Sequence, residues 1–344
     1  MKNQNYIIST IFASFFGVLL AYSAVNLSSF SPAPAQVASP VLAPEPVVVP
    51  APAKPDSVAL TFVGDIMLDR GVLFSVKKNG QADFNWLFTD LASLKSADIL
   101  FANLEGPLSD VGKKVGSIYS FRMLPEFAPA LAQAGFDILS LANNHIGDWT
   151  REAMDDTVRR LNLVGIRTVG VGKNKIDTTQ PRIIEKNNLR IGFLAFSDVG
   201  PDWLSASEQE SGIIPASAGN LPEIIRQAST QVDHLIISFH FSEEYQAKSN
   251  ARQQYLARLA IDNGARLVIG HHPHVAEEVE RYHDGLIAYS LGNFIFDQAF
   301  SPETMQGLVL EVKLDKKGIL EARTRVSQQD AFFRPHLSLE SLDV

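Results

Sequence analysis

The sequence predicts one α/β layered domain with β-hairpin additions, preceded by an export segment and a spacer. Three observations lead to this prediction. Short apolar runs alternate with helical stretches from Val58 onward, further β-rich runs follow with turn residues between them, and the N-terminal part of the 344-residue chain differs in composition from the rest. We therefore expect a signal anchor or signal peptide over 1–27, a linker over 28–56, the domain over 57–330 and a C-terminal tail over 331–344.

An apolar run close to the N-terminus predicts export. Ile7–Val25 is a run of nineteen uncharged, mostly apolar residues behind Lys2, and a helix of that length spans roughly the hydrocarbon core of a bilayer. A buried core helix and a signal peptide cleaved near Ala21–Ser23 are the alternatives. We expect an uncleaved single-pass membrane helix with the domain extracytoplasmic, or a secreted domain if the signal is cleaved.

The segment that follows reads as a disordered spacer. Ser28–Pro55 holds eight of the eighteen prolines, interleaved with Ala and Val. Proline fixes φ and removes a hydrogen-bond donor, so this Pro/Ala-rich linker should resemble polyproline II rather than a packed layer. Such a spacer holds a domain away from a membrane or carries it across a cell wall, and composition does not separate the two.

The alternation within the domain predicts five buried strands and five helices. The strands are expected at Val58–Val63, Ile99–Ala102, Ile138–Leu141, Leu235–Phe239 and Leu267–Ile269. The helices are expected at Trp86–Leu94, Glu126–Ala134, Arg151–Leu163, Leu221–Ser229 and Gln253–Asn263. Gly135 and Gly264 follow two of these helices, where a left-handed residue commonly ends a helix.

Further β-rich runs predict hairpins added to this core. They lie at Arg182–Glu185, Arg190–Phe196, Val275–Tyr282, Ile287–Leu291, Leu308–Leu314 and Leu320–Val326. Asn187-Asn188 and His283–Gly285 supply the turn residues between two of the pairs.

Composition excludes several kinds of site. The chain has no cysteine, which rules out disulfides, thiolate metal ligands and a cysteine nucleophile. A net charge of −8 lacks the basic footprint of nucleic-acid binding, so no nucleic-acid partner is expected. Any metal must be held by His, Asp, Asn or Glu, a set that suits Mn, Fe, Zn or Mg.

Polar residues stand where each of the five buried strands ends. These strand-end residues are Asp65, Asn103 with Glu105, Asn143–His145, His240 and His271–His274. In open α/β sheets, ligand sites form outside the carboxyl ends of the strands. Five strand ends carrying such residues therefore predict one polar site at one edge of the domain.

The histidine triplet is the strongest single signal in this set. His271, His272 and His274 are three of only eight histidines in the chain. Pro273 biases His272 toward an extended conformation, in which residues two apart point the same way. His272 and His274 should then share one centre, while His271 faces elsewhere as a supporting donor.

Each strand-end residue taken alone has a structural explanation. Asp65 could make a turn or cap a helix, Asn144 could be a turn residue, and His145 could bond a loop carbonyl. His240 could be a core histidine with both ring nitrogens bonded. The five strand ends taken together favour a functional site.

Five motifs resemble the bacterial CapA family of poly-gamma-glutamate capsule biosynthesis proteins. The motifs are Gly64–Leu68, Asn103–Pro107, Leu141–His145, Gly270–His274 and Tyr289–Phe294, in consistent order between about Val58 and Gln298. The resemblance implies a calcineurin-like metallophosphatase fold, a four-layer αββα sandwich with its site at one edge. It also implies a role in the synthesis, export or anchoring of an anionic surface polymer, with membrane-embedded capsule synthesis subunits as possible partners.

This resemblance suggests roles for the strand-end residues. The metal ligands would be Asp65, Glu105, Asn144, His240, His272 and His274, around one or two divalent cations. His145 and Asp65 would be catalytic, with His145 stabilising the transition state or protonating the leaving oxygen. Asn103, Arg122, Asn143, Glu244, His271 and Asn293 would contact an anionic polymer or phosphorylated substrate, or support the ligands. Arg122 is alternatively a surface arginine, Asn293 a turn residue, and Asp148 is expected to cap the helix that begins near Trp149.

Three departures from the wider metallophosphatase pattern bear on catalysis. Met67 stands where that pattern has a histidine, and Asn103 with Glu105 stands where it has a metal-bridging aspartate; both resemble the CapA family itself. Phe241-Ser242 replaces a more usual Trp-Gly. Three hypotheses follow: a metal-dependent hydrolase or transferase, a non-catalytic component that binds an anionic polymer, and a general exported metallophosphoesterase.

Overall fold

The computed structural model of the chain describes residues 56–116 and 118–344. The expected membrane helix and almost all of the expected linker lie outside the described residues. Among the residues that are described, no helix has the length and apolar character needed to cross a membrane.

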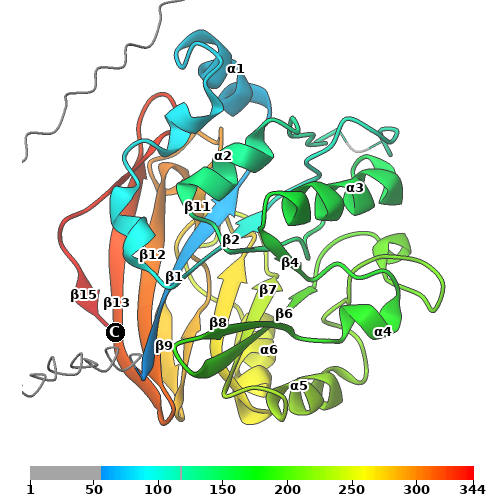
Figure 1. The fold of residues 1–344 in the computed structure, drawn as a ribbon, viewed down its shortest axis with the longest axis vertical. Coiled ribbons are helices and arrows are strands. Elements are labelled where there is room, and N and C mark those ends of the chain that lie inside the picture. The colour runs from blue at the N-terminus through cyan, green and yellow to red at the C-terminus, as the bar shows by residue number, and fades with distance from the viewer. Residues whose placement is uncertain (1–55, 117) are drawn as a thin grey trace, which may run out of the picture. The chain divides into compact units, whose positions relative to one another are not determined.

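Nine strands form the larger of two sheets (Figure 1). They are β1 (Ser57–Ile66), β2 (Ile99–Leu104), β3 (Ile138–Ser140), β4 (Arg167–Val169), β11 (Asn293–Ile295), β12 (Gln306–Asp315), β13 (Gly318–Gln329), β14 (Pro335–Leu337) and β15 (Leu342–Asp343). Their order is β14-β13-β12-β1-β2-β3-β4, with β11 also pairing β1 and β15 also pairing β13. β1 to β4 are parallel, whereas β12 runs antiparallel to β1.

The smaller sheet has six strands in the order β5-β6-β7-β8-β10-β9. They are β5 (Arg182–Lys186), β6 (Leu189–Ser197), β7 (His234–His240), β8 (Ala265–His271), β9 (Val279–Tyr282) and β10 (Gly285–Ala288). β6, β7, β8 and β10 are parallel, and the two edge strands run antiparallel to their neighbours.

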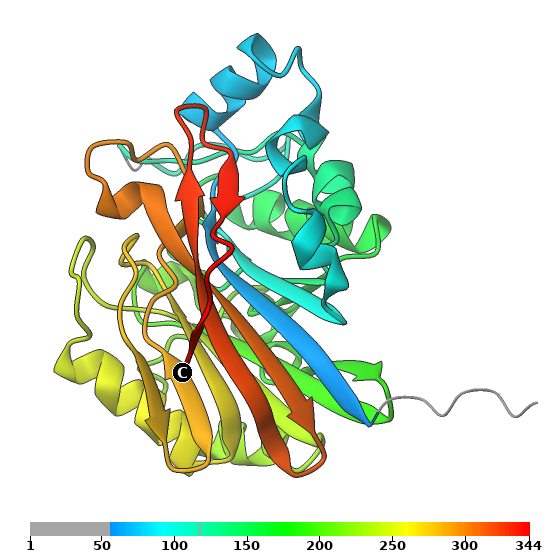
Figure 2. The ribbon, with the colours of Figure 1, turned by 90° about the vertical axis from the view of Figure 1, so that its left-hand side faces the viewer.

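Helices cover the outer faces of the two sheets. The α-helices are α1 (Arg70–Lys78), α2 (Phe127–Ala134), α3 (Thr150–Leu163), α4 (Lys175–Thr178), α5 (Leu221–Ser229) and α6 (Ala251–Asp262). The 3-10 helices are η1 (Phe84–Phe88), η2 (Ala92–Ser96), η3 (Asp202–Leu204) and η4 (Glu303–Met305). Figure 2 shows the helix, sheet, sheet and helix layers side by side, with α5 and α6 against the smaller sheet.

The apolar core lies between the sheets. Phe101 of β2 stacks on Phe193 of β6 with ring centroids 5.9 Å apart, and Phe62 of β1 packs against Phe101 at 5.7 Å. A second buried cluster joins Phe239 of β7 to α5 and α6. β1, β2 and β7 are buried along nearly their whole length, as expected for strands covered on both faces.

Most of the predicted elements are confirmed, but the helix expected at Trp86–Leu94 is wrong. That stretch forms η1 and η2 instead, because the Asp83 carboxylate caps the first turn through the Asn85 amide at 3.0 Å and the chain turns between the two short helices. The sequence reading also missed α1 and the three-residue strands β4 and β11. Residues 331–344, expected as a tail, contribute β14 and β15, which pair with β13.

The glycines predicted to end two helices and the asparagines predicted to form a turn have left-handed backbone conformations. Gly135 and Gly264 end α2 and α6 with φ of 103° and 105°. Asn187 and Asn188 join β5 to β6 with φ of 49° and 65°, which suits a two-residue hairpin turn.

Candidate metal centre

Both sheets direct strand ends to the same edge of the sandwich. Asp65 of β1 pairs in register with Asn103 of β2 on one side and with Asn293 of β11 on the other. In the smaller sheet, His240 of β7 pairs with His271 of β8. Because these strands run parallel within each sheet, their polar ends meet in one group of side chains.

Two glycines let the strands approach closely enough to form this group. A Cβ atom on Gly64 would lie 1.9 Å from the Gly292 carbonyl oxygen, and one on Gly270 would lie 1.8 Å from the Tyr289 carbonyl oxygen. The Asp65 amide donates to the Gly292 oxygen at 2.9 Å, which ties the first strand end to the segment before β11. Any side chain at either glycine would force the strands apart.

Two buried carboxylates stand at the centre, joined by an amide. Asp65 and Glu105 are fully buried. Asn103 Nδ2 donates to Asp65 Oδ1 at 2.9 Å and faces Glu105 Oε2 at 3.5 Å, while Asn103 Oδ1 accepts from Asn143 Nδ2 at 3.1 Å. Asn143 Nδ2 also donates to the Leu104 carbonyl oxygen, so a backbone group determines which way these amides point.

All three histidines of the triplet surround Asp65. His271 Nδ1 lies 3.0 Å from Asp65 Oδ1, and the His272 amide donates to Asp65 Oδ2 at 3.2 Å. His274 Nδ1 lies 3.5 Å from Asp65 Oδ2 and 2.9 Å from Asn293 Oδ1. His274 Nε2 then faces Glu105 Oε1 at 3.7 Å, which places this ring between both carboxylates.

The extended conformation predicted for the triplet is wrong, although its rings do meet. His272 and His274 have φ of 99° and 60°, in the left-handed region that non-glycine residues rarely adopt. Their ring centroids lie 6.0 Å apart. The reason is tertiary: the chain must turn sharply after β8 to bring both the His272 amide and the His274 ring onto Asp65. Such strained residues gather at functional sites.

Asn144 follows β3 of the larger sheet and His240 ends β7 of the smaller sheet, and their side chains contact each other beside the group. His240 Nε2 lies 2.8 Å from Asn144 Oδ1, and the His240 ring lies 4.7 Å from the His272 ring between centroids. Glu244, in the exposed loop after β7, completes a group with His272 and His274 whose ligand atoms all lie within 4.8 Å of one another.

His145 is oriented by Asp148, a residue whose role was predicted wrongly. His145 Nδ1 lies 2.8 Å from Asp148 Oδ2, which also accepts the Phe121 amide at 2.8 Å. The Asp148 side chain therefore does not cap α3, for which Trp149 is the cap residue. His145 Nε2 then faces Glu105 Oε1 at 3.9 Å. The signal for Asp148 was its position three residues after a candidate catalytic histidine.

A cavity of about 740 Å³ opens over the group. Its lining includes Asn144, His145, Glu244, His274 and Arg70. Arg70 was not predicted from the sequence. Its guanidinium pairs with Asp297 and lies 4.6 Å from the centroid of the Phe121 ring. Arg70 and Asp297 are 227 positions apart in the chain, so no local sequence signal indicates this pair.

Arg122, predicted to contact a phosphate or carboxylate, lies elsewhere. Its Nε donates to the Ser109 carbonyl oxygen at 3.0 Å and its Nη2 to the Val111 carbonyl oxygen at 3.4 Å. The guanidinium also stacks over Trp149 at 4.1 Å. Arg122 thus holds a loop in place, and Arg70 is the arginine that reaches the cavity.

Burial and charge shift the pKa values of the central groups in opposite directions. Burial raises the pKa of Glu105 to about 7, with the neighbouring Asp65 charge adding to the rise. Burial alone would raise the pKa of Asp65, but hydrogen bonds from His271 and His274 hold it well below its usual range. Burial lowers the pKa of His272 to about 4, and that of His240 falls well below its usual value for the same reason.

The donor set fits a divalent cation. Asp65, Glu105 and His274 offer ligand atoms that lie within 4.8 Å of one another, and His274 is shared with the Glu244–His272 group. Four buried side-chain atoms of this group have no hydrogen-bond partner among the described residues: Glu105 Oε1, His240 Nδ1, His271 Nε2 and His272 Nδ1. Buried polar atoms without partners are costly, and a cation would satisfy those that face it.

Met67 takes no part in this donor set. It is fully buried and packs with Phe121 and Phe296 as an apolar wall beside the group. Its sulfur accepts the Asp69 amide at 3.1 Å. The side chain at this position therefore shapes the site rather than supplying a nitrogen ligand.

Comparison with known protein families shows which family the chain belongs to. The profile described as bacterial capsule synthesis protein PGA_cap matches residues 59–298. The chain belongs to this family. It is 31% identical over 263 residues to the capsule biosynthesis protein CapA of Bacillus anthracis, covering 74% of this chain and 63% of that protein. It is also 31% identical over 266 residues to the PGA biosynthesis protein CapA of Bacillus subtilis, covering 76% of this chain and 69% of that protein.

A more distant relative carries a different name. The chain is 25% identical over 286 residues to a probable polyglutamine synthesis accessory protein of Mycobacterium tuberculosis, covering 71% of this chain and 75% of that protein. The chain spans less than two thirds of the length of the Bacillus anthracis relative.

Two solved structures align with this chain at low sequence identity. A novel phosphatase from Mycoplasma pneumoniae aligns with 12% identity and a TM-score of 0.47, covering 84% of this chain and 93% of that one. A 5'-nucleotidase precursor from Thermus thermophilus aligns with 14% identity and a TM-score of 0.46, covering 78% and 54%.

Proposed function

We propose that this PGA_cap family member acts on an anionic capsule polymer of the poly-gamma-glutamate type as a metal-dependent hydrolase or transferase. The observation that carries the proposal is the buried Asp65–Glu105–His274 group beneath an open cavity. Two fully buried carboxylates and four buried atoms of the group without hydrogen-bond partners support a bound cation at this place, and the cavity above them gives a substrate access to it. The names of the Bacillus relatives support the choice of polymer.

In this proposal, some residues of the site bind the cation and others position a proton donor. A divalent cation held by Asp65, Glu105 and His274 would lower the pKa of a bound water and polarise the bond under attack. His271 and Asn293 orient Asp65 and His274 by the hydrogen bonds described above. Asp148 occupies Nδ1 of His145, which leaves Nε2 free to give a proton to the leaving group.

Arg70 provides the positive charge for an anionic substrate. Its side chain is 36% exposed at the cavity, and Asp297 holds the guanidinium in place. An arginine in this position can contact a carboxylate or phosphoryl oxygen through two N–H groups.

The test uses the full-length protein. Bound metal is measured by elemental analysis, and hydrolysis of phosphate esters and of gamma-linked glutamate oligomers is measured with Mn, Zn and Mg. We expect bound metal and activity in the wild type, loss of both in Asp65→Ala and His274→Ala, and retention of both in His283→Ala. His283 lies on an exposed turn and serves as the matched histidine control. A protein without metal or activity, whose Asp65→Ala variant still supports polymer production in cells, would overturn the proposal.

A second function has one specific observation in its favour. Asn103 places an amide N–H between the carboxylates, where it donates to Asp65 rather than offering an oxygen to a second cation. This arrangement suits a component that uses a single cation to bind polymer or organise membrane partners without catalysis. Metal-dependent oligomer binding with no turnover would support this function. Turnover of nucleotides alone would instead support a general exported metallophosphoesterase.

We further propose that residues 1–27 anchor the protein in the cell membrane, with the domain on the outer side. The support is the uncharged run Ile7–Val25 behind Lys2 and the proline-rich spacer after it. Fractionation of cells that express the full chain should find it in the membrane and sensitive to external protease, whereas a form lacking residues 2–27 should stay in the cytoplasm. Cytoplasmic full-length chain would contradict the proposal.

A further inference from the structure

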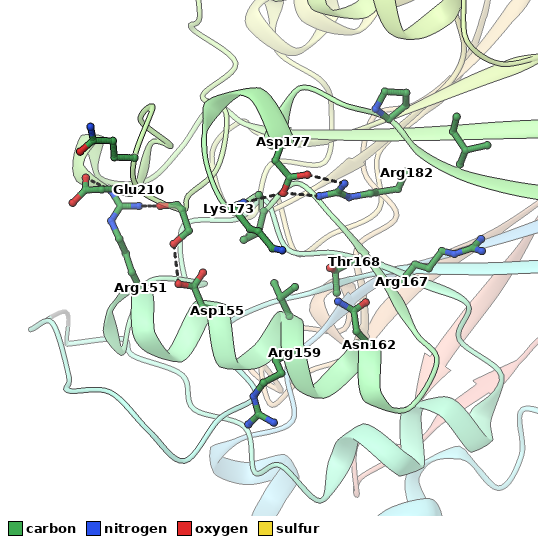
Figure 3. A pocket seen from close by; sticks show the side chains of 17 residues that line it. Arg151, Asp155, Arg159, Asn162, Arg167, Thr168, Lys173, Asp177, Arg182 and Glu210 are labelled. Carbon is green, nitrogen blue, oxygen red and sulfur yellow. Dashed lines mark hydrogen bonds and ion pairs between the residues drawn. The ribbon is translucent and has the colours of Figure 1, made fainter.

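A second, larger cavity lies away from the metal centre. It measures about 1120 Å³ and is formed by α3, β4, α4, the start of β5 and residues 209–211 (Figure 3). β4 is the last strand of the larger sheet and β5 is the edge strand of the smaller sheet. The cavity therefore sits where free edges of both sheets come together.

Most of the charged side chains around this cavity are already paired. Arg182 forms two contacts with Asp177, at 3.1 and 3.2 Å, and Arg151 donates to backbone carbonyls and faces Glu210 at 3.7 Å. Asp155 accepts the Ser211 hydroxyl at 2.9 Å. These pairs hold the walls in place and leave little charge of their own for a ligand.

Five polar side chains of the lining have no hydrogen bond or ion pair to another described residue. They are Asn162 of α3, Arg167 and Thr168 of β4, Lys173 of the loop before α4, and Gln209. Thr168 is only 5% exposed, and Figure 3 shows Thr168, Asn162 and Lys173 pointing into the cavity. A largely buried threonine, an asparagine and a lysine that all point into one cavity indicate a site for a polar, anionic ligand.

The backbone of β4 adds hydrogen-bonding groups at the same place. The Arg167 amide donates to the Asp137 oxygen and the Val169 oxygen accepts the Leu141 amide, both on the side of β3. Because peptide groups alternate along a strand, those of Thr168 point away from β3 toward the free edge. An edge of this kind can pair with the amide groups of an extended chain.

Apolar side chains complete the lining. Val158 of α3, Val171, Pro181 and Ile183 contribute to the wall between the charged groups. A ligand that matches the whole cavity therefore has amide groups, methylene groups and carboxylates. The lining carries five cationic and three acidic side chains, although the chain as a whole has a net charge of −8.

We propose that this cavity binds an extended segment of an acidic polyamide, with Lys173 and Arg167 contacting its carboxylates and Thr168 its amide groups. The polymer named in the proposed function is one source of such a chain, and this identification rests on that function. An acidic segment of a partner protein is the other source. The site is separate from the metal centre. It would hold one part of the polyamide ligand while another part of the same ligand reaches the cavity above Asp65.

The experiment measures binding of two labelled probes to the full-length protein at physiological salt: a gamma-linked glutamate decamer and an alpha-linked glutamate decamer. We expect Lys173→Glu and Arg167→Glu each to weaken binding roughly tenfold, as loss and reversal of one carboxylate contact implies. Lys316→Glu makes the same charge change in the exposed β12–β13 turn and should bind within about twofold of the wild type. Tighter binding of the gamma-linked probe assigns the polymer as ligand, and tighter binding of the alpha-linked probe assigns a protein segment.

The same measurement separates this inference from the proposed function. EDTA and His274→Ala should abolish metal binding and activity, whereas the loss of decamer affinity caused by Lys173→Glu and by Arg167→Glu should be the same with and without EDTA. If the protein has no activity but the decamer binds with dependence on Lys173, the catalytic proposal fails and this site stands. Affinities within twofold of the wild type in both Lys173→Glu and Arg167→Glu, or no binding of either probe, would overturn the site.

Discussion

Asn103 determines how the two buried carboxylates of the site can be used. It lies between Asp65 and Glu105 with its Nδ2 directed at both, and Asn143 occupies its oxygen. The amide thus stabilises two negative charges that would otherwise repel each other in a buried place. A carboxylate in the same position would add charge and could bridge two cations.

Substitution of Asn103 by Asp tests this interpretation. Asn103→Asp adds a third buried carboxylate and removes the hydrogen bond that Asn103 Nδ2 donates to Asp65, so in EDTA we expect a loss of about 2 kcal/mol or more in the free energy of unfolding. Added Mn should raise the melting temperature of the variant more than that of the wild type, because a cation neutralises the extra charge. Equal shifts in both proteins would show that this position does not face the cation.

Asp148 acts through His145 and is a positioning residue. Asp148→Asn keeps an oxygen for the Phe121 amide but removes the charge behind the His145 ring. We expect kcat for the hydrolytic reaction to fall about 10- to 100-fold with KM within threefold, because the loss falls on proton transfer rather than substrate binding. A change in KM alone, or parallel loss of stability and activity, would assign Asp148 a purely structural role.

At the scale of elements, the close approach of strands decides whether the site forms. The Gly270 position in β8 faces the Tyr289 carbonyl oxygen, and the Leu291 amide donates to the Gly270 oxygen at 3.2 Å. The site therefore depends on main-chain contacts that no side chain can replace.

Gly270→Ala should lower the free energy of unfolding by about 3 kcal/mol or more, because its Cβ would overlap backbone atoms that cannot move alone. Gly219→Ala is the matched control, since nothing lies within 4 Å of the added Cβ and φ is not positive there. Urea unfolding of both variants measures the difference. Equal stability of the two variants would contradict the close approach of these strands.

The junction between α6 and the segment before β9 carries a pH-dependent contact. The Gln253 side chain accepts the amide of Asn250, the N-cap residue of α6, and donates to the buried Glu277 carboxyl at 2.6 Å. Burial raises the pKa of Glu277 from 4.5 to about 7, with Glu278 adding to the rise. Since the unfolded chain loses this proton first, this contribution to stability is largest below about pH 4.5 and declines as the pH rises to 7.

Glu277→Gln should remove that decline. We expect the variant to gain about 1–2 kcal/mol of unfolding free energy over the wild type at pH 8 and to lose the advantage at pH 4.5. Urea unfolding at both pH values measures the gain. A constant difference between the two proteins across this range would contradict the assignment.

At the scale of the whole molecule, metal binding should stabilise the domain, because its ligands come from strands of both sheets. Mn or Zn at about one hundred times its Kd should raise the melting temperature by roughly 5 °C, and EDTA should reverse the shift. His274→Ala should abolish it, since this ring lies in both candidate ligand groups. A shift that persists in His274→Ala would place the cation elsewhere.

The sequence alone predicted that the polar strand-end side chains lie close together. Strand ends at Asp65, Asn103, Asn144, His240 and the histidine triplet carried a signal because a buried strand is a short apolar run and a polar residue directly after it is easily recognised. The family followed from the same motifs, and the profile match confirms it. Alternation of strands and helices likewise indicated the layered α/β class.

Only the tertiary structure decided which residues cooperate. Asp297 holds Arg70, β4 and β5 meet at the second cavity, and Asp148 orients His145 rather than capping a helix. His272 and His274 adopt left-handed conformations instead of the predicted extended one, because the chain must turn after β8 to reach Asp65. Local patterns report burial and backbone preference near each residue, whereas these contacts depend on where distant segments meet, which the packing of the two sheets determines.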